Sequence, residues 1–200
     1  MINEYIHYRL PLKLINSYTW ANLIKPAKAI LPILGAYANK DGKAWPGVKI
    51  IAELAGYRDP RYRKIRYGME NLIKNKLVIR EKPGRHYVYY LTSLALRKGR
   101  ESFFPIYKEA MIISRKWARL TSSEKSLYPV LGNKAKVNDP DAMDTEFHAI
   151  GNIYEFNKYV EWSGISRPSF DSAYQDLNHK NLIAFWPKVD FGKYGIYVPR

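Results

Sequence analysis

The sequence predicts an α+β protein made of two copies of one small domain, each with three helices followed by a β-hairpin. Three observations support this prediction: an internal repeat, apolar residues at helical spacing in the first part of each copy, and short β-rich stretches at its end. The chain has 200 residues, 46% of them hydrophobic, which is enough to bury a core in one large or two small domains. We place the two domains at residues 1–95 and 96–200.

The repeat begins at two tryptophans. The segment WANLIKPAKAILPILGAYA from Trp20 aligns without a gap with WARLTSSEKSLYPVLGNKA from Trp117, and eight of the nineteen positions are identical. Average residue usage would give roughly one or two identities by chance. A further match aligns Gly56 with Gly164. The polar, basic stretch at 93–104 is the expected short linker between the copies.

In the first copy, three segments have the pattern of helices. The first is expected over about 26–39, and turn-forming residues over 39–47 end it. A short helix with one apolar face follows over 48–55, and Gly56 supplies its C-terminal stop. A third helix is predicted over about 60–75. Its inward face is formed by Ile65, Met69, Leu72 and Ile73.

A β-hairpin is predicted to close each copy. In the first copy, LVIREK and RHYVYYL are joined by Pro83-Gly84, which suits a type II turn. The second copy repeats the plan with helices over 155–164 and 167–181 and a hairpin over 182–198. The matched tryptophans are interpreted as core residues between the segment before the first helix and the hairpin.

Positive charge is concentrated in the first half of the chain. Residues 1–100 contain 20 Lys and Arg against 6 Asp and Glu, a net charge of +14, whereas residues 101–200 contain 13 against 12, a net charge of +1. This asymmetry favours a polyanionic partner, with nucleic acid ahead of an anionic membrane surface. No apolar run is long enough to span a membrane, no secretion signal is evident, and cysteine is absent. We therefore expect a cytoplasmic protein without disulfides or membrane contact.

The segments AWPGVKIIAELAGY and IRYGMENLIKNKLVIREK resemble the winged-helix family of helix-turn-helix domains found in phage and plasmid replication proteins and small regulators. Such domains typically have a Trp-Pro start, a Leu-Ala ending before Gly, and a helix that closes in Leu-x-x-x-Gly-Leu-Ile. The chain departs from this pattern at Asn75-Lys76, where the family often has Gly, and in a longer turn that contains Pro60. The resemblance covers 20–92 and, more weakly, 117–198. It implies tandem winged-helix domains, an architecture also similar to that of plasmid replication initiators.

The strongest functional signal is the stretch RDPRYRKIRYGMENL at 58–72. In helix-turn-helix proteins the N-terminal part of the third helix enters the major groove, where arginine pairs with guanine. We expect Arg61, Arg63 and Lys64 to contact bases and Arg58 and Arg66 to hold phosphates. The alternative is an ordinary solvated charged face. The predicted DNA-contacting residues of this segment are Arg58, Arg61, Arg63, Lys64, Arg66 and Tyr67.

The hairpin adds a weaker set of candidates. Arg80, Lys82 and Arg85 flank its turn, from which winged-helix hairpins commonly touch phosphate or the minor groove; the alternative is that they are solvated turn charges. Tyr87 and Tyr89 share one face of a strand. Aromatic residues at such positions are more often core or cross-strand residues than nucleic-acid contacts.

The second copy has a different outer surface. Its third helix presents Ser166, Arg167, Ser169 and Ser172, which suit base contacts, but this near-neutral copy lacks the charge that neutralises phosphates. It is either a weaker DNA-binding module or a protein-binding and dimerising module. Its acidic insert at 137–150 lacks the Gly and terminal Glu of a calcium loop, so we interpret it as a flexible acidic loop.

The sequence does not suggest an enzyme. The four histidines are scattered, and no phosphate-binding Gly-rich loop, nucleophile elbow or metal-ligand spacing is present. We therefore expect no cofactor and no metal. The predicted function is binding of double-stranded DNA to regulate transcription or replication of a mobile element. The alternatives are a replication initiator that recruits helicase or primase, and an interaction module for an acidic protein; a homodimer or a replication or transcription protein is a further expected partner.

Overall fold

The computed structural model describes residues 7–59, 61–96, 102–134, 149–152, 156–186 and 193–196. It is an α+β protein with three small antiparallel sheets among these residues. The first half contains β1 (His7–Pro11), α1 (Leu12–Asn16), α2 (Thr19–Asn22), α3 (Lys25–Tyr37), β2 (Lys43–Ala44), α4 (Val48–Ala55), α5 (Arg63–Lys74), β3 (Val78–Glu81) and β4 (Val88–Leu91).

The second half contains the same kinds of element in the same order, with a π-helix in place of α1. These are β5 (Phe103–Tyr107), η1 (Lys108–Ile113), α6 (Lys116–Arg119), α7 (Ser122–Lys134), β6 (Ala149–Asn152), α8 (Phe156–Ser163), α9 (Arg167–His179), β7 (Ile183–Trp186) and β8 (Lys193–Ile196). The sheet of each half has the equivalent strand order, β2-β4-β3 and β6-β8-β7. We call the two halves copy 1 and copy 2.

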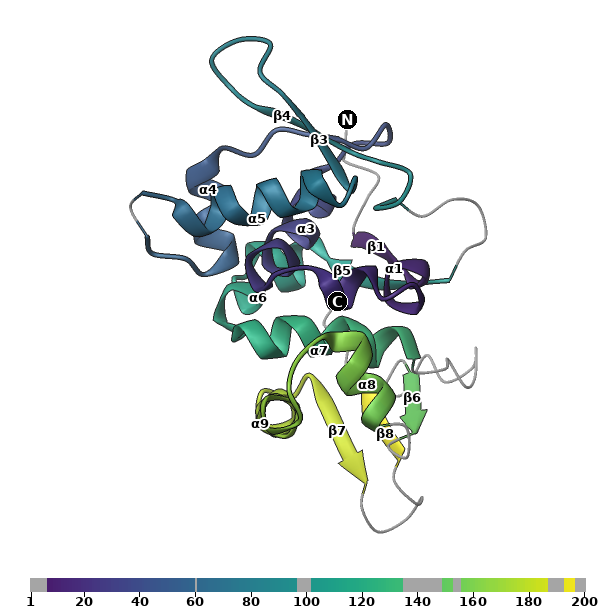
Figure 1. Ribbon diagram of the computed structural model, residues 1–200. Helices are drawn as coiled ribbons and strands as arrows, with labels where there is room; N and C mark the ends of the chain where they lie inside the picture. Colours follow the sequence, from purple (N-terminus) through teal and green to yellow (C-terminus); the bar gives the residue numbers. More distant parts are fainter. Residues whose placement is uncertain are drawn as a thin grey trace.

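The third sheet joins the copies. β1 pairs with β5 in antiparallel register, with Tyr8 opposite Ile106, Leu10 opposite Phe104 and Arg9 opposite a proline at the centre. In Figure 1 this sheet and the helices α3 and α7 lie in the middle, and the β3–β4 and β7–β8 hairpins point to opposite ends of the view. Equivalent elements of the two copies therefore meet at the centre of the molecule.

The contacts across this centre are reciprocal. The indole nitrogen of Trp20 donates a hydrogen bond to the Ser126 carbonyl in α7, at 2.8 Å, and that of Trp117 donates to the Ala29 carbonyl in α3, at 3.0 Å. Ala29 and Ser126 are matched positions of the repeat. The tryptophans are buried as expected, but each bonds to the other copy. The interpretation that they fill the core of their own copy is wrong, because their donors reach an acceptor only across the interface.

Two glycines bring the backbones of the copies together. A Cβ on Gly56 would lie 2.2 Å from the carbonyl oxygen of Ala118 in α6, and a Cβ on Gly164 would lie 2.2 Å from that of Ala21 in α2. Both glycines have a left-handed φ, 79° and 64°, directly after α4 and α8. Each therefore both stops a helix and allows a close approach that a side chain would block. The copies are thus related like the subunits of a symmetric dimer, by a pseudo-twofold axis.

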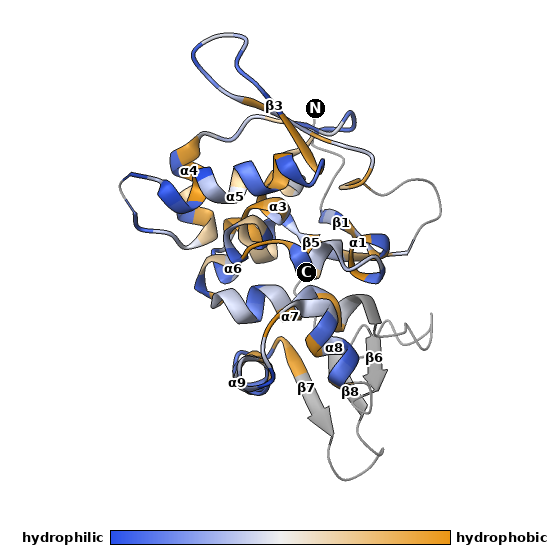
Figure 2. Cartoon of the chain, in the orientation of Figure 1, coloured by the Kyte–Doolittle hydropathy of each residue, from blue (hydrophilic) through white to orange (hydrophobic). Residues whose placement is uncertain are grey.

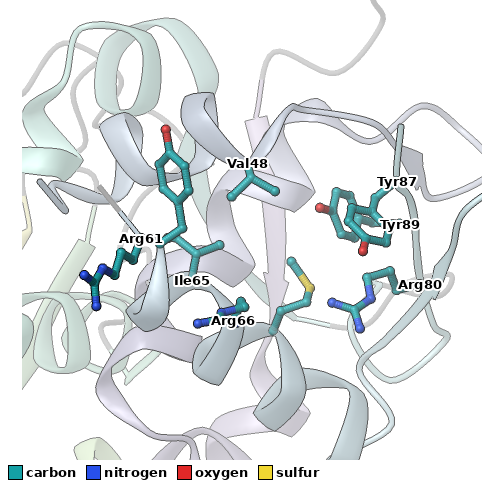
Figure 3. Close-up of a pocket in the computed structure, with 9 residues that line it drawn as sticks. Val48, Arg61, Ile65, Arg66, Arg80, Tyr87 and Tyr89 are labelled. Carbon is teal, nitrogen blue, oxygen red and sulfur yellow. The ribbon is translucent and has the colours of Figure 1, made fainter. Parts of the chain in front are cut away.

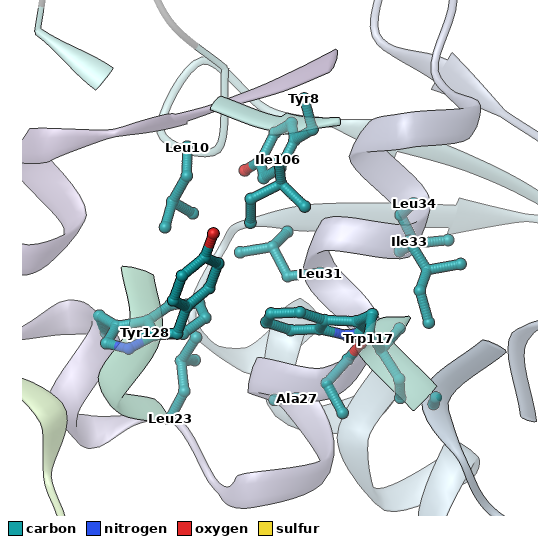
Figure 4. Packing of buried hydrophobic residues seen from close by; sticks show 14 of the residues in the cluster. Tyr8, Leu10, Leu23, Ala27, Leu31, Ile33, Leu34, Ile106, Trp117 and Tyr128 are labelled. Carbon is teal, nitrogen blue, oxygen red and sulfur yellow. Dashed lines mark hydrogen bonds between the residues drawn. The ribbon is translucent and has the colours of Figure 1, made fainter. Parts of the chain in front are cut away.

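Apolar residues from both copies form one core. Figure 4 shows Trp117 of copy 2 beside Ala27 and near Leu31 of copy 1, with Tyr8 above and Tyr128 to the left, and all five side chains are at most 3% exposed. In Figure 2 apolar colour is seen on α3, which is buried from Ala27 to Ala36, and hydrophilic colour covers the loop of the β3–β4 hairpin. Burial of this shared apolar surface is the main stabilising term.

The third helix of copy 1 begins later than the sequence predicted. α5 starts at Arg63 rather than near residue 60, because the Asp59 carboxylate accepts hydrogen bonds from the backbone nitrogens of Arg61 and Arg63, both at 3.0 Å. These bonds hold Arg61 and Tyr62 in a turn instead of a helix. Arg61 therefore precedes α5, and the expectation that it projects from the helix is wrong.

Three other segments differ from the prediction. The turn over 39–47 contains β2, which pairs with β4, and the Asn39 side chain accepts from the backbone nitrogens of residues 41 and 43 to shape the turn before it. The expected linker at 93–104 ends inside β5. Residues 7–22, for which no element was expected, form β1, α1 and α2. β1 and β5 are far apart in the sequence, so a local sequence pattern does not predict that they pair.

The departure from the Gly pattern after α5 has a visible consequence. Lys76 has a left-handed φ of 57°, and Asn181 after α9 has one of 54°. A residue with a Cβ adopts this conformation at a cost, which glycine avoids. In both copies, the backbone directly after the third helix therefore has a conformation that glycine would adopt at lower cost.

Candidate nucleic-acid interface

α5 is fixed on α3 by one apolar face. Ile65, Met69 and Leu72 are buried, and Gly68 lies so close to α3 that a Cβ there would be 2.5 Å from an Ile30 methyl. The basic residues of the helix are consequently held on its remaining faces. Arg63, Lys64, Arg66 and Tyr67 are all exposed, Tyr67 with 61% of its surface.

The connection between α4 and α5 is ordered by Asp59. Besides the two backbone bonds, its carboxylate pairs with the Arg63 guanidinium at 3.5 Å. The backbone hydrogen bond from Arg61, assisted by that from Arg63 and by the Arg63 charge, lowers the pKa of Asp59. The carboxylate is therefore ionised at neutral pH and keeps Arg61 and Arg63 in place at the start of α5.

A groove of about 500 Å³ runs between α5 and the β3–β4 hairpin. Its apolar floor comes from Val48, Ile65 and Met69, and three guanidinium groups surround it. Figure 3 shows Arg61 and Arg66 on the side of α5 and Arg80 on the side of the hairpin, next to Tyr87 and Tyr89. The groove residues are Val48, Arg61, Tyr62, Ile65, Arg66, Met69, Arg80, Tyr87 and Tyr89.

The hairpin side of the groove is organised around Tyr87. The Arg80 guanidinium carbon lies 5.0 Å and the Lys82 ammonium 5.7 Å from the centre of its ring, distances at which a cation is attracted to an aromatic face. Tyr87 is 37% exposed, whereas its neighbour Tyr89 is 1% exposed. Burial raises the pKa of Tyr89, an effect that Arg80 opposes. Tyr89 is thus the core residue of the pair, and Tyr87 remains open to solvent.

The other predicted residues of copy 1 lie around this groove. The Lys64 ammonium is 5.1 Å from the ring centre of Tyr57, on the connection between α4 and α5. Arg58 in that connection and Arg85 in the hairpin loop are exposed. The structure brings Arg61, Arg66 and Arg80 together at one groove and places the remaining cations beside it.

In copy 2, three of the predicted DNA-contacting residues, Ser166, Arg167 and Ser169, interact with other side chains of copy 2. The Arg167 guanidinium contacts the Asp171 carboxylate at 3.1 Å and the Asn157 side-chain oxygen at 3.2 Å, and lies 5.2 Å from the Phe156 ring centre. The hydroxyls of Ser166 and Ser169 are hydrogen-bonded at 3.0 Å.

Ser172 is exposed and Ser169 half-buried. The start of α9 is therefore a polar surface. Arg167, the cation predicted there, is paired with side chains of its own copy. The acidic insert at 137–150 lies outside the described residues except for its last two, Ala149 and Ile150.

No known protein family, curated protein or solved structure matches the chain. Its chemistry must be inferred from the arrangement of its own residues. Within the described ranges there is no group of three His, Asp or Glu residues that could hold a metal ion. No helix in the same ranges combines the length and apolar character needed to cross a membrane.

Two tyrosines that line the groove and reach solvent, Tyr62 and Tyr87, were not predicted as part of the site. Tyr62 was not considered, and Tyr87 was interpreted as a core or cross-strand residue. The sequence contains a signal for Tyr87, because it follows a turn flanked by Arg80, Lys82 and Arg85. Cations around an aromatic residue at a hairpin tip are typical of surfaces that contact nucleic acids.

Proposed function

We propose that this protein binds double-stranded DNA through α5 and the β3–β4 hairpin, and that each copy is a winged-helix domain. The observation that supports this most is the groove that Arg61, Arg66 and Arg80 line together with an exposed tyrosine. Three guanidinium groups without a shared carboxylate suit phosphate oxygens, which they bind in bidentate fashion. The helix with its exposed Arg63 and Lys64 is the element expected to enter the major groove.

The biological role that we propose is regulation of transcription or replication of a mobile element. A regulator should protect one operator at a promoter in a footprinting experiment. A replication initiator should fill several repeated sites at an origin, and would then recruit helicase or primase. The footprint distinguishes these roles, since both use the same contacts with the duplex.

The test of DNA binding is fluorescence anisotropy of a random duplex of about 30 base pairs with the full chain, over a series of salt concentrations. Each phosphate contact contributes about 0.9 to the slope of log affinity against log salt. We expect a slope of about 4 to 8 in magnitude, because the eight predicted cations of copy 1 lie on or next to the groove. Arg66→Ala/Arg80→Ala should reduce the slope by about 2.

Lys13→Ala/Lys158→Ala is the matched control, since it removes the same formal charge from α1 and α8, which contact each other near α2. Equal losses in both double variants would indicate that net charge alone determines binding. Absence of binding even at low salt would refute the DNA proposal. It would favour the alternative in which the basic groove binds an acidic protein.

A further inference from the structure

Three cations of copy 2 lie next to the predicted DNA-binding surface of copy 1. Arg115 immediately precedes α6, and Lys116 and Arg119 lie on it; all three are exposed. α6 packs against α4 of copy 1 (Figure 1). The close approach of Gly56 to the Ala118 carbonyl joins α6 to the start of the α4–α5 connection.

Side-chain contacts also link the region around α6 to α4 and to the α4–α5 connection. Tyr57 lies near Ser122, the first residue of α7, and an interaction with Ser122 opposes the burial that raises the pKa of Tyr57. The same tyrosine ring lies under the Lys64 ammonium of α5, at 5.1 Å. Arg115 reaches Glu53 of α4 at 3.6 Å. The cations at α6 are therefore held beside the basic N-terminal end of α5.

The repeat provides an internal comparison for these three positions. In copy 1 the equivalent helix is α2, which contacts α8 of copy 2 as α6 contacts α4, and Gly164 approaches α2 as Gly56 approaches α6. The residues before the two helices share a left-handed φ, 58° and 62°. The fold thus forms the same contact without any cation. The equivalent positions hold Tyr18, Thr19 and Asn22 in copy 1 and Arg115, Lys116 and Arg119 in copy 2.

The charges at α6 are also not neutralised within the part of the chain that the structure describes. There, no carboxylate lies within ion-pair distance of Lys116 or Arg119. Arg115 has one such partner, Glu53, and its side chain remains 63% exposed. An exposed ion pair of this kind is weak and competes poorly with a phosphate. The three cations are consequently available to a polyanion.

We propose that Arg115, Lys116 and Arg119 form a second phosphate-binding patch, contributed by copy 2 to the DNA site of copy 1. This inference rests on the proposed function. A duplex presents a phosphate charge about every 1.7 Å along its axis, so a duplex seated on α5 continues past the α4–α5 connection onto α6. The patch contacts the backbone and not the bases, so it raises affinity for all sequences equally.

The test is the full-length double variant Lys116→Ala/Arg119→Ala in the same anisotropy and salt series. The slope of log affinity against log salt should fall by about 2 in magnitude, with equal losses on random and selected duplexes. Thr19→Ala/Asn22→Ala, at the equivalent positions of copy 1, should leave the slope unchanged. Lys13→Ala/Lys158→Ala controls for the loss of two charges, and far-ultraviolet circular dichroism checks that each variant is folded.

The outcomes separate this inference from the proposed function. If the Arg66→Ala/Arg80→Ala slope falls and the Lys116→Ala/Arg119→Ala slope does not, the DNA site stands and the patch is refuted. An equal loss in the Lys13→Ala/Lys158→Ala control also refutes the patch, because net charge then explains the effect. A wild-type chain that binds no duplex at low salt overturns both proposals.

Discussion

Raising the pH from 7 to 9 should stabilise the protein, because two lysines are buried between the copies. Lys28 is 1% exposed, and its ammonium donates to the carbonyl oxygens of Ser163 and Ala21, at 2.7 and 3.2 Å. The matched Lys125 is 4% exposed and donates to the Ala118 carbonyl at 3.4 Å. Burial lowers the pKa of both lysines to about 8, from an ordinary value of 10.5.

The direction and size of the effect follow from proton linkage. Because the folded pKa lies below the unfolded one, the unfolded chain binds more protons between pH 8 and 10.5, and the free energy of unfolding rises with pH in that window. Between pH 7 and 9 each lysine contributes about 1 kcal/mol, and both together about 2 to 3 kcal/mol. Burial raises the pKa of Tyr8 and Tyr128, but this opposes stability only as the pH approaches the unfolded tyrosine value near 10.

Urea unfolding at pH 7, 8 and 9 and constant ionic strength measures this dependence. Lys28→Met should remove about half of the rise and Lys125→Met the other half. Lys49→Met, at an exposed position of α4, is the matched control and should keep the full rise. A wild-type free energy of unfolding that is flat or falling from pH 7 to 9 would refute the reasoning. An undiminished rise in Lys28→Met would show that Lys28 is not its source.

Three further substitutions test the fold. Gly56→Ala should lower the free energy of unfolding by at least about 2 kcal/mol, because its φ is 79° and a Cβ would overlap α6; Gly84→Ala, with nothing within 4 Å of its Cβ, should change little in the same urea titration. Lys76→Gly should raise the thermal midpoint, with a gain of about 1 kcal/mol from relief of the left-handed φ; a lower midpoint would contradict this. Trp117→Phe should cost about 2 kcal/mol in urea, because a carbonyl in α3 loses its donor; an unchanged midpoint would show that this bond contributes nothing.

Local patterns predicted the helices that bury one face. The spacing of Ile65, Met69 and Leu72 placed α5, and Gly56 placed the end of α4, because periodicity and glycine chemistry act over a few residues. The start of α5 was missed because it depends on the Asp59 carboxylate, which competes with the helix for backbone donors. β2 was missed because it is two residues long and exists only through its pairing with β4.

The candidate site was predictable in composition but not in geometry. Charge clustering identified Arg61, Arg66 and Arg80, but their convergence on one groove depends on how the hairpin folds over α5. The spacing of Arg167 and Asp171, four residues apart on a helix, is typical of an ion pair, but we interpreted Arg167 as a base contact. The approach of α6 to α4 was not visible, because the sequence showed that the copies are alike and not how they face each other.

The reciprocal tryptophans have a consequence for synthesis of the protein. The acceptor for Trp20 is Ser126, 106 residues later in the chain. At translation rates of about 5–20 residues per second, Trp20 is therefore synthesised roughly 5–20 s before its acceptor. During this interval the apolar surface around Trp20 is exposed to solvent and to chaperones. The rate at which α7 is translated therefore sets how long Trp20 is without its hydrogen-bond acceptor.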